Sequence, residues 1–178
     1  MDDRTDPDLG TLDAAGERWT LTFTRSYPHP IELVWAAITE PEHLAAWFPQ
    51  TIVGERRAGA APRFVTTDDG DEGFDGTMVA FDPPRAMELT WGDDRLRFEL
   101  EPDGDGTRLT MVDTFGELGK AARDAAGWHE CLARLDASMA GTELADWSST
   151  WSAVHPIYVR VLGPEASTVG PPEDARPT

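Results

Sequence analysis

The residue whose type and position most suggest chemistry is an aspartate within an apolar alternation. In the stretch "TRLTMVDTF", Leu109, Met111, Asp113 and Phe115 fall on one face of a predicted strand. If that face lies in the interior, Asp113 is a buried carboxyl group, which must be paired or protonated. Such a group could orient a hydroxyl or amine of a ligand, or act as an acid or base. If the strand ends or bulges near residue 112, Asp113 returns to solvent, and the sequence leaves both outcomes open.

Aromatic side chains are the second feature that could form a site. The chain has seven Trp and seven Phe, more than a polar surface would carry. Packing in the core is the simpler explanation for any one of them, but together they could line an apolar cavity, the usual form of a small-molecule site. We therefore predict that the ligand-binding residues are Trp47, Phe48, Phe64, Met78, Trp91, Phe98, Met111, Asp113, Phe115 and Trp128.

The other reactive groups form no motif in the sequence. The four histidines include no close pair at metal-ligand spacing. His129 and Cys131 lie two residues apart in a predicted helix, so they point to different faces. The acidic stretch "DDGDEGFDG", residues 68–76, lacks the closing Glu of a calcium loop. No phosphate loop or serine-nucleophile motif is present. The sequence therefore predicts no metal, no cofactor and no catalytic residue.

Composition excludes several classes of partner. The formal net charge is -18, and because nucleic acids and anionic membranes are bound by basic patches, it argues against both. No stretch approaches the roughly 20 apolar residues of a membrane-spanning helix. The single cysteine, Cys131, excludes an internal disulfide, and the N-terminus shows no secretory signal. We expect a cytoplasmic protein with neither a nucleic-acid nor a membrane partner.

The predicted elements follow the chain in a simple order. "RWTLTFTRSY" alternates as a strand, and two short helices begin at Pro30 and Pro41. Short alternating runs separated by turn residues fill residues 50–115 and predict a meandering antiparallel sheet. An apolar stripe at spacings of three and four, which includes Trp128, predicts one long helix near residues 119–140.

One domain accounts for most of the chain. We place it at residues 17–162, with its core at 18–141 and a helical extension at 142–162. Residues 1–16 and 163–178 are rich in Asp, Gly, Pro and small polar residues. Such segments bury too little apolar surface to become ordered, so both are predicted to be flexible tails.

The helical extension carries an apolar seam that must be covered. Pro156 should break or kink its helix, because proline removes a backbone hydrogen bond and clashes with the preceding turn. We expect the seam to pack on the chain's own domain, with a homodimer contact as the alternative. The seam consists of Leu144, Trp147, Trp151, Val154 and Tyr158.

A sheet with one apolar face must be covered, and only the long helix is long enough to cover it. We therefore predict an α+β fold in which a curved antiparallel sheet wraps around a long C-terminal helix. The two short helices would close the open end, with Trp47 and Phe48 at the mouth of the cavity. Arg97 and Arg108 alternate outward, so we expect neither to neutralise Asp113.

Two stretches carry a resemblance to a known family: "SYPHPIELVWAAITEPEHLAAWFP" at 26–49 and "GWHECLARLDASMAG" at 127–141. With the strands between them, they resemble the START-like (SRPBCC) helix-grip superfamily. Within it they are similar to the branch named after the activator of the heat-shock-protein-90 ATPase (Aha-like proteins). The resemblance spans roughly residues 18–141 and implies a helix-grip fold with a cavity. The superfamily includes lipid and hormone carriers, polyketide cyclases and aromatases, and co-chaperone domains, so the fold does not choose a function.

These observations lead to one expected function and two alternatives. We expect the protein to bind a small apolar or aromatic molecule in an internal cavity, without catalysis. The first alternative is a co-chaperone-like interaction module with a chaperone partner, which a filled cavity and an exposed apolar patch would favour. The second is an enzyme resembling a polyketide cyclase or aromatase, with Asp113 as acid or base. A deep cavity with several facing polar groups would favour it.

Overall fold

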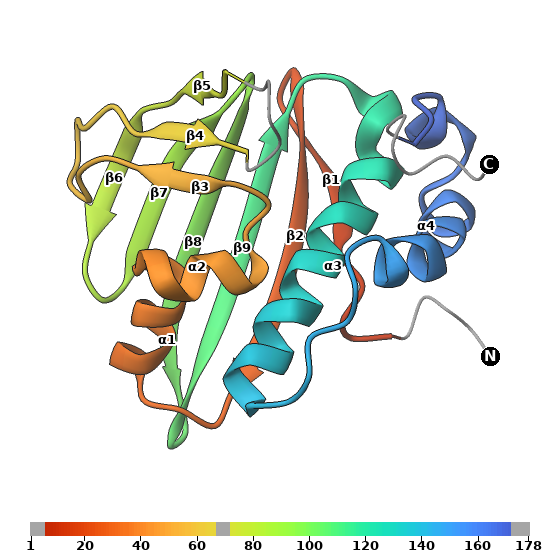
Figure 1. The fold of residues 1–178 in the computed structure, drawn as a ribbon. Helices are drawn as coiled ribbons and strands as arrows, with labels where there is room; N and C mark the ends of the chain where they lie inside the picture. The colour runs from red at the N-terminus through yellow and green to blue at the C-terminus, as the bar shows by residue number, and fades with distance from the viewer. Residues whose placement is uncertain (1–5, 67–71, 172–178) are drawn as a thin grey trace.

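The computed structural model describes residues 6–66 and 72–171 (Figure 1). The ends of the two predicted tails, residues 1–5 and 172–178, lie outside the described residues. So do residues 67–71, which include the start of the acidic stretch that we compared with a calcium loop. None of the described helices is long and apolar enough to cross a membrane.

A six-stranded antiparallel sheet forms the body of the fold, in the order β1-β2-β9-β8-β7-β6. The strands from β6 to β9 form the predicted meander, and β2 pairs along its length with β9, from Trp19 opposite Phe115 to Tyr27 opposite Thr107. The strands are β1 (Thr11–Ala15), β2 (Arg18–Tyr27), β6 (Met78–Asp82), β7 (Ala86–Trp91), β8 (Asp94–Asp103) and β9 (Gly106–Phe115).

The long helix α3 (Ala121–Ala140) covers one face of this sheet, after a short 3-10 helix η2 (Leu118–Lys120). This confirms the helix predicted near residues 119–140 and the α+β helix-grip fold (Figure 1). Trp128, Leu132 and Leu135 are buried beneath the helix. The helix ends at Gly141, whose φ of 68° lies in the left-handed region that terminates helices.

Two short helices cover the same face beside α3. α1 (Ile31–Thr39) packs on β8 and β9, and α2 (Pro41–Trp47) packs on α3. Pro41 occupies the first turn of α2, where the missing proline N–H has no intrahelical partner to lose. The indole N–H of Trp47 donates a 3.0 Å hydrogen bond to the carbonyl of Ala37, which fixes α2 against α1.

A second sheet was not predicted. Its three strands, β3 (Thr51–Val53), β4 (Arg63–Val65) and β5 (Phe74–Asp75), pair in sequence order and lie across β6, β7 and β8 in Figure 1. The run "GFDGTMVAF", residues 73–81, lies among the short runs predicted for residues 50–115, and it is divided at Gly76 and Thr77 between β5 and β6. A Cβ on Gly76 would lie 2.5 Å from the Phe64 ring and 2.6 Å from the Thr90 carbonyl oxygen, so glycine lets the two sheets approach each other.

The C-terminal helix α4 (Ser149–Leu162) packs on α3 of the same chain, as expected for the apolar seam. Leu144 and Trp147 precede this helix. Pro156 was predicted to break or kink the helix; the break is wrong, because α4 continues through Pro156 to Leu162. Contacts on both sides hold the helix together: the ring of Trp151 stacks on His155 at 4.3 Å, and Tyr158 is fully buried. Tertiary packing here outweighs the loss of one backbone hydrogen bond.

The predicted tails were wrong for the segments nearest the domain. Residues Thr11–Ala15 form β1, an edge strand that pairs with β2. A 3-10 helix, η3 (Pro164–Ser167), buries Ala166, and the N–H of Val169 bonds to the carbonyl of Gly119. Neither segment has an apolar alternation long enough to reveal it. Backbone pairing orders both: β1 forms a hairpin with the adjacent β2, and Val169 bonds to Gly119, 50 residues earlier in the chain.

Candidate functional site

The predicted side chains come from the large sheet, from β4 of the second sheet, from α3 and from the end of α2. Nine of the ten predicted ligand-binding residues are buried, and Trp91 is half-buried. The buried set is Trp47, Phe48, Phe64, Met78, Phe98, Met111, Asp113, Phe115 and Trp128. The structure therefore brings the predicted residues to one interior, between the sheet, α2 and α3.

Five aromatic rings in this interior contact one another in a closed cycle, which we call the aromatic cluster. It comprises Phe48, Phe64, Phe74, Trp91 and Trp128. Successive ring centroids lie 6.3, 5.0, 6.2 and 5.2 Å apart, and Trp128 closes the cycle on Phe48 at 6.0 Å. Phe74 was not among the predicted residues. Its signal was weak, because β5 has only two residues and shows no alternation.

The predicted mouth of the cavity was wrong. Trp47 is fully buried and Phe48 is 4 % exposed, and the ring of Trp47 packs edge-on against Phe48 and Phe98. α2 ends at Trp47, just before Phe48 and Pro49, and the rings of Trp47 and Phe48 both lie in the interior. The half-buried members of the cluster are Phe74 and Trp91, so these two form its solvent-facing edge.

The aromatic cluster is packed, ring against ring. A ligand bound among these five side chains would therefore have to displace at least one of them. Trp91 is the member with a polar tether at the edge, because its indole N–H donates a 2.6 Å hydrogen bond to Oε1 of Gln50. Trp91 and Gln50 are both half-buried, so water or a ligand could replace this hydrogen bond more easily than the buried bond of the other indole in the cluster, that of Trp128.

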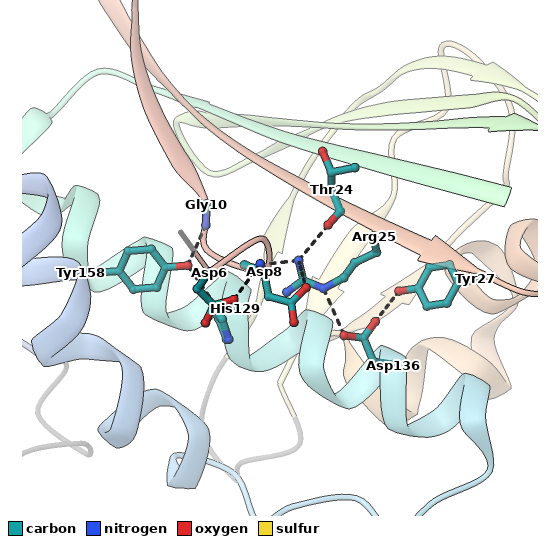
Figure 2. A network of polar contacts seen from close by, with 9 residues as sticks. All are labelled: Asp6, Asp8, Gly10, Thr24, Arg25, Tyr27, His129, Asp136 and Tyr158. Carbon is teal, nitrogen blue, oxygen red and sulfur yellow. Dashed lines mark hydrogen bonds and ion pairs between the residues drawn. The ribbon is translucent and has the colours of Figure 1, made fainter. Parts of the chain in front are cut away.

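A groove of about 670 Å³ lies elsewhere, between the N-terminal segment, β2 and the end of α3. Arg25 and Tyr27 line it, and both bond to Asp136 of α3 (Figure 2). Arg25 also donates to the carbonyls of Asp8 and Thr24. The buried polar groups of this groove thus bind one another, which gives it the character of a structural junction.

Asp113 is fully buried, which decides between the two outcomes that the sequence left open. The indole N–H of Trp128 donates a 2.9 Å hydrogen bond to its Oδ2. Its Oδ1 has no hydrogen-bond partner among the described residues. Burial, and next the nearby charge of Asp94, raise the pKa of Asp113 to about 7, although the Trp128 hydrogen bond opposes this shift.

Two further carboxylates lie beside Asp113, and sequence reasoning missed both. One oxygen each from Asp94, Asp113 and Asp124 lies within 4.8 Å of the others. Lys120 bonds to Oδ2 of Asp94 and lies 3.3 Å from Oδ2 of Asp124. These groups come from β8, β9 and α3 with its preceding turn, so no sequence spacing could reveal the cluster. We call Asp94, Asp113 and Asp124 the acidic trio.

The outward arginines behave as the alternation predicted. Arg97 binds Glu88 and Glu99 on the outer face, and Arg108 binds Asp103. Lys120 is the cation that lowers the pKa of Asp113, and its effect is smaller than those of burial and Asp94. A carboxyl group with a pKa near 7 can accept or donate a proton at neutral pH, and an ionised one can bind a hydrogen-bond donor.

This chain is similar to proteins whose family or structure is known. Residues 28–140 match the family described as "Activator of Hsp90 ATPase homolog 1-like protein". A search of the curated proteins gave no significant match. Many solved structures share the fold.

Three solved structures illustrate the range of the similarity. CalU16 from Micromonospora echinospora is 19% identical, with a TM-score of 0.67 over 86% of this chain and 95% of that one. The conserved protein EF2215 from Enterococcus faecalis is 18% identical, with a TM-score of 0.73 over 90% and 94%. DynU16, from the dynemicin biosynthetic locus, is 26% identical, with a TM-score of 0.58 over 69% and 48%.

The family match spans most of the helix grip, from the start of α1 to the end of α3. It therefore covers every residue of the aromatic cluster and of the acidic trio. The chain belongs to the family of proteins like the activator of Hsp90 ATPase homolog 1.

Proposed function

We propose that this protein binds a small, flat, largely aromatic molecule between α3 and the sheet, at the aromatic cluster and Asp113. The observation that carries the proposal is the unpartnered Oδ1 of Asp113, in a residue that is fully buried. A buried polar atom without a partner destabilises a fold by roughly 1–3 kcal/mol. An interior that served stability alone would do better with an apolar side chain at this position.

The aromatic cluster supports the same proposal. The rings of a flat ligand could make the contacts that a displaced side chain gives up, so that binding would cost little packing energy. Trp91 and Phe74 are the members that could move, since they are half-buried and lie at the edge. A hydroxyl or amine on the ligand would then supply the donor that Oδ1 of Asp113 lacks.

The experiment is a binding titration with 2-naphthylmethanol as the probe, monitored by isothermal calorimetry and by tryptophan fluorescence. We expect the wild type to bind it and Trp91→Ala to bind it at least tenfold more tightly, because the probe then no longer has to displace the Trp91 ring. Trp147→Ala is the matched control, because Trp147 is 46 % exposed and packs on Arg134, away from the cluster. Failure of the wild type to bind any neutral flat aromatic probe would contradict the proposal.

A protein-interaction module is the second candidate, and the packing of the cluster favours it. Rings that already satisfy one another need no ligand, and the family is named after an activator of the Hsp90 ATPase. The test is the ATPase rate of a purified chaperone of the heat-shock-protein-90 class with and without this protein. Stimulation that survives Trp91→Ala, together with absence of probe binding, would make this candidate the better one.

A further inference from the structure

We propose that the ligand of this site is an aromatic amine that binds as a monovalent cation, with its ammonium group on Asp113 and its rings in the aromatic cluster. This inference rests on the proposed function and specifies its ligand class. It is carried by the charges around Asp113 and by the position of Trp128.

When all three of its carboxyl groups are ionised, the acidic trio is one positive charge short. Lys120 is engaged by Asp94 and Asp124, and Arg123 binds Oδ1 of Asp124 at 2.7 Å. Three carboxylates therefore share two cations, and among the described residues Asp113 is the member to which no cation donates a hydrogen bond. Among the described residues, no group forms a hydrogen bond with its buried Oδ1. A single ammonium group would supply both the missing charge and the missing donor.

The size of the deficit selects among cations. A divalent metal ion would exceed it by one charge and would have to displace Lys120 from Asp94. A monovalent ammonium ion can leave Lys120 in place and use only the free oxygen of Asp113. An anionic ligand would meet three carboxylates at short range and is excluded by repulsion. A neutral alcohol supplies a donor for the oxygen but no positive charge, so Asp113 keeps its proton.

Trp128 joins the acidic trio to the aromatic cluster. Its indole N–H binds Oδ2 of Asp113, while its ring contacts Phe48 and Trp91. A ligand whose rings lie in the cluster therefore has its substituent next to the carboxylate. The surrounding indole and phenyl faces attract a cation as well, which adds to the preference for an amine over an alcohol of the same shape.

Binding of a cation at Asp113 has a proton signature. The titratable and charged groups that face Asp113 are Asp94, Asp124 and Lys120, and they remain in place in both states. An ammonium group favours the ionised carboxylate, so below about pH 7 the amine displaces a proton from Asp113. A neutral alcohol retains that proton.

The experiment compares three probes of one shape: 2-naphthylmethylamine, 2-naphthylmethanol and 2-naphthoate. Calorimetry at pH 6.5, in two buffers of different ionisation enthalpy, gives both the affinity and the number of protons released. We expect the amine to bind at least tenfold more tightly than the alcohol and to release a proton, and the naphthoate to show no binding. In Asp113→Asn the amine should bind only as tightly as the alcohol, and its binding should release no proton.

Glu101→Gln is the matched control, because it removes one carboxylate from an exposed position of the same sheet. Thermal melting checks that each variant is folded, and proton release by the wild type tests the inference without any variant. Equal affinity of amine and alcohol would overturn the inference and leave the proposed function standing. Failure of all three probes would overturn both. Stabilisation by Ca²⁺ or Mg²⁺ that Asp113→Asn removes would assign the trio to a metal ion instead.

Discussion

The indole N–H of Trp128 and the Oδ2 atom of Asp113 are 2.9 Å apart, and this bond links α3 to the central strand β9. It is buried on both sides, and each partner depends on the other. Trp128 would otherwise hold an indole N–H without an acceptor, and Asp113 would have neither oxygen bonded within the described residues. The bond therefore couples the packing of the long helix to the ionisation of a carboxyl group.

Substitutions of Trp128 separate packing from ionisation. Trp128→Ala should destabilise the fold by about 3–5 kcal/mol, because it leaves a large cavity under α3. Trp128→Phe keeps most of the ring and removes the N–H, so it should destabilise less and raise the pKa of Asp113 further. Urea denaturation gives the first quantity and NMR titration of the Asp113 carboxyl carbon the second. An unchanged pKa in Trp128→Phe would show that the bond has no influence on ionisation.

The pKa of Asp113 predicts how stability depends on pH. The pKa of Asp113 rises from its ordinary value of 3.8 to about 7 in the folded protein, so between these two values the folded state retains a proton that the unfolded chain has lost. The free energy of unfolding should therefore fall as pH rises from about 4 to 7, by up to about 4 kcal/mol from this group. Above pH 7 the penalty is constant.

The measurement for this prediction is the difference in unfolding free energy between the wild type and Asp113→Asn at several pH values. The carboxylates outside the acidic trio contribute equally to both proteins, so the difference reports Asp113 together with its coupling to Asp94 and Asp124. The free energy of unfolding of Asp113→Asn, relative to that of the wild type, should therefore increase as pH rises to 7. A difference that does not vary with pH would mean that Asp113 ionises in the folded protein as it does in the unfolded chain.

Lys120 should contribute more at high pH than at low pH. Its ammonium group binds Asp94 and lies close to Asp124, and its side chain is only 15% exposed. Lys120→Met leaves Asp94 without its cation, while Asp124 keeps Arg123, and should destabilise the protein by about 1–3 kcal/mol at pH 8. At pH 5 the loss should be smaller, because Asp113, whose pKa is about 7, is protonated and the cluster carries one negative charge fewer. Adding Asp94→Asn should recover part of the loss; no recovery would place the effect elsewhere.

The hydroxyl of Tyr158 ties both ends of the described chain to α3. It accepts a 2.9 Å hydrogen bond from the N–H of Gly10 and lies 3.0 Å from Nδ1 of His129 (Figure 2). Tyr158→Phe leaves the buried Gly10 N–H without this acceptor and should destabilise the fold by about 1–3 kcal/mol. Hydrogen exchange of the Gly10 amide should accelerate in this variant.

Tyr27→Phe is the matched control for that prediction. It also removes one phenolic hydroxyl, but the partner, Asp136, is 37% exposed and keeps its bond to Arg25. We expect a loss below about 1 kcal/mol, since water can replace the hydroxyl there. Equal losses in the two variants would show that burial of the Gly10 amide is not what makes the Tyr158 bond strong.

Local periodicity was enough to predict which strand residues face inward. The alternation of Leu109, Met111, Asp113 and Phe115 is a property of one strand, and the structure confirms it for all four. The order of elements, the long helix and the family resemblance were predictable for the same reason. Each depends on a pattern within one segment of the chain.

The features that escaped prediction depend on contacts between distant segments. Asp94 and Asp124 meet Asp113 only through the register of β8 on β9 and the rotation of α3. Whether the aromatic rings enclose a space or pack against each other depends on side-chain volumes and on the second sheet. β1 escaped prediction for a different reason: it pairs with β2, its neighbour in the sequence, through backbone bonds that composition does not encode.

The pairing of β2 with β9 has a consequence for the order in which the chain can fold during synthesis. β2 is made early and can form a hairpin with β1, but its other edge has no partner until the ribosome has released β9. Leu21 and Phe23 then still await α3, which is translated later. Contacts of such long sequence separation fold slowly and leave apolar surface uncovered meanwhile. The nascent chain therefore carries an open strand edge and a bare apolar face for most of its translation.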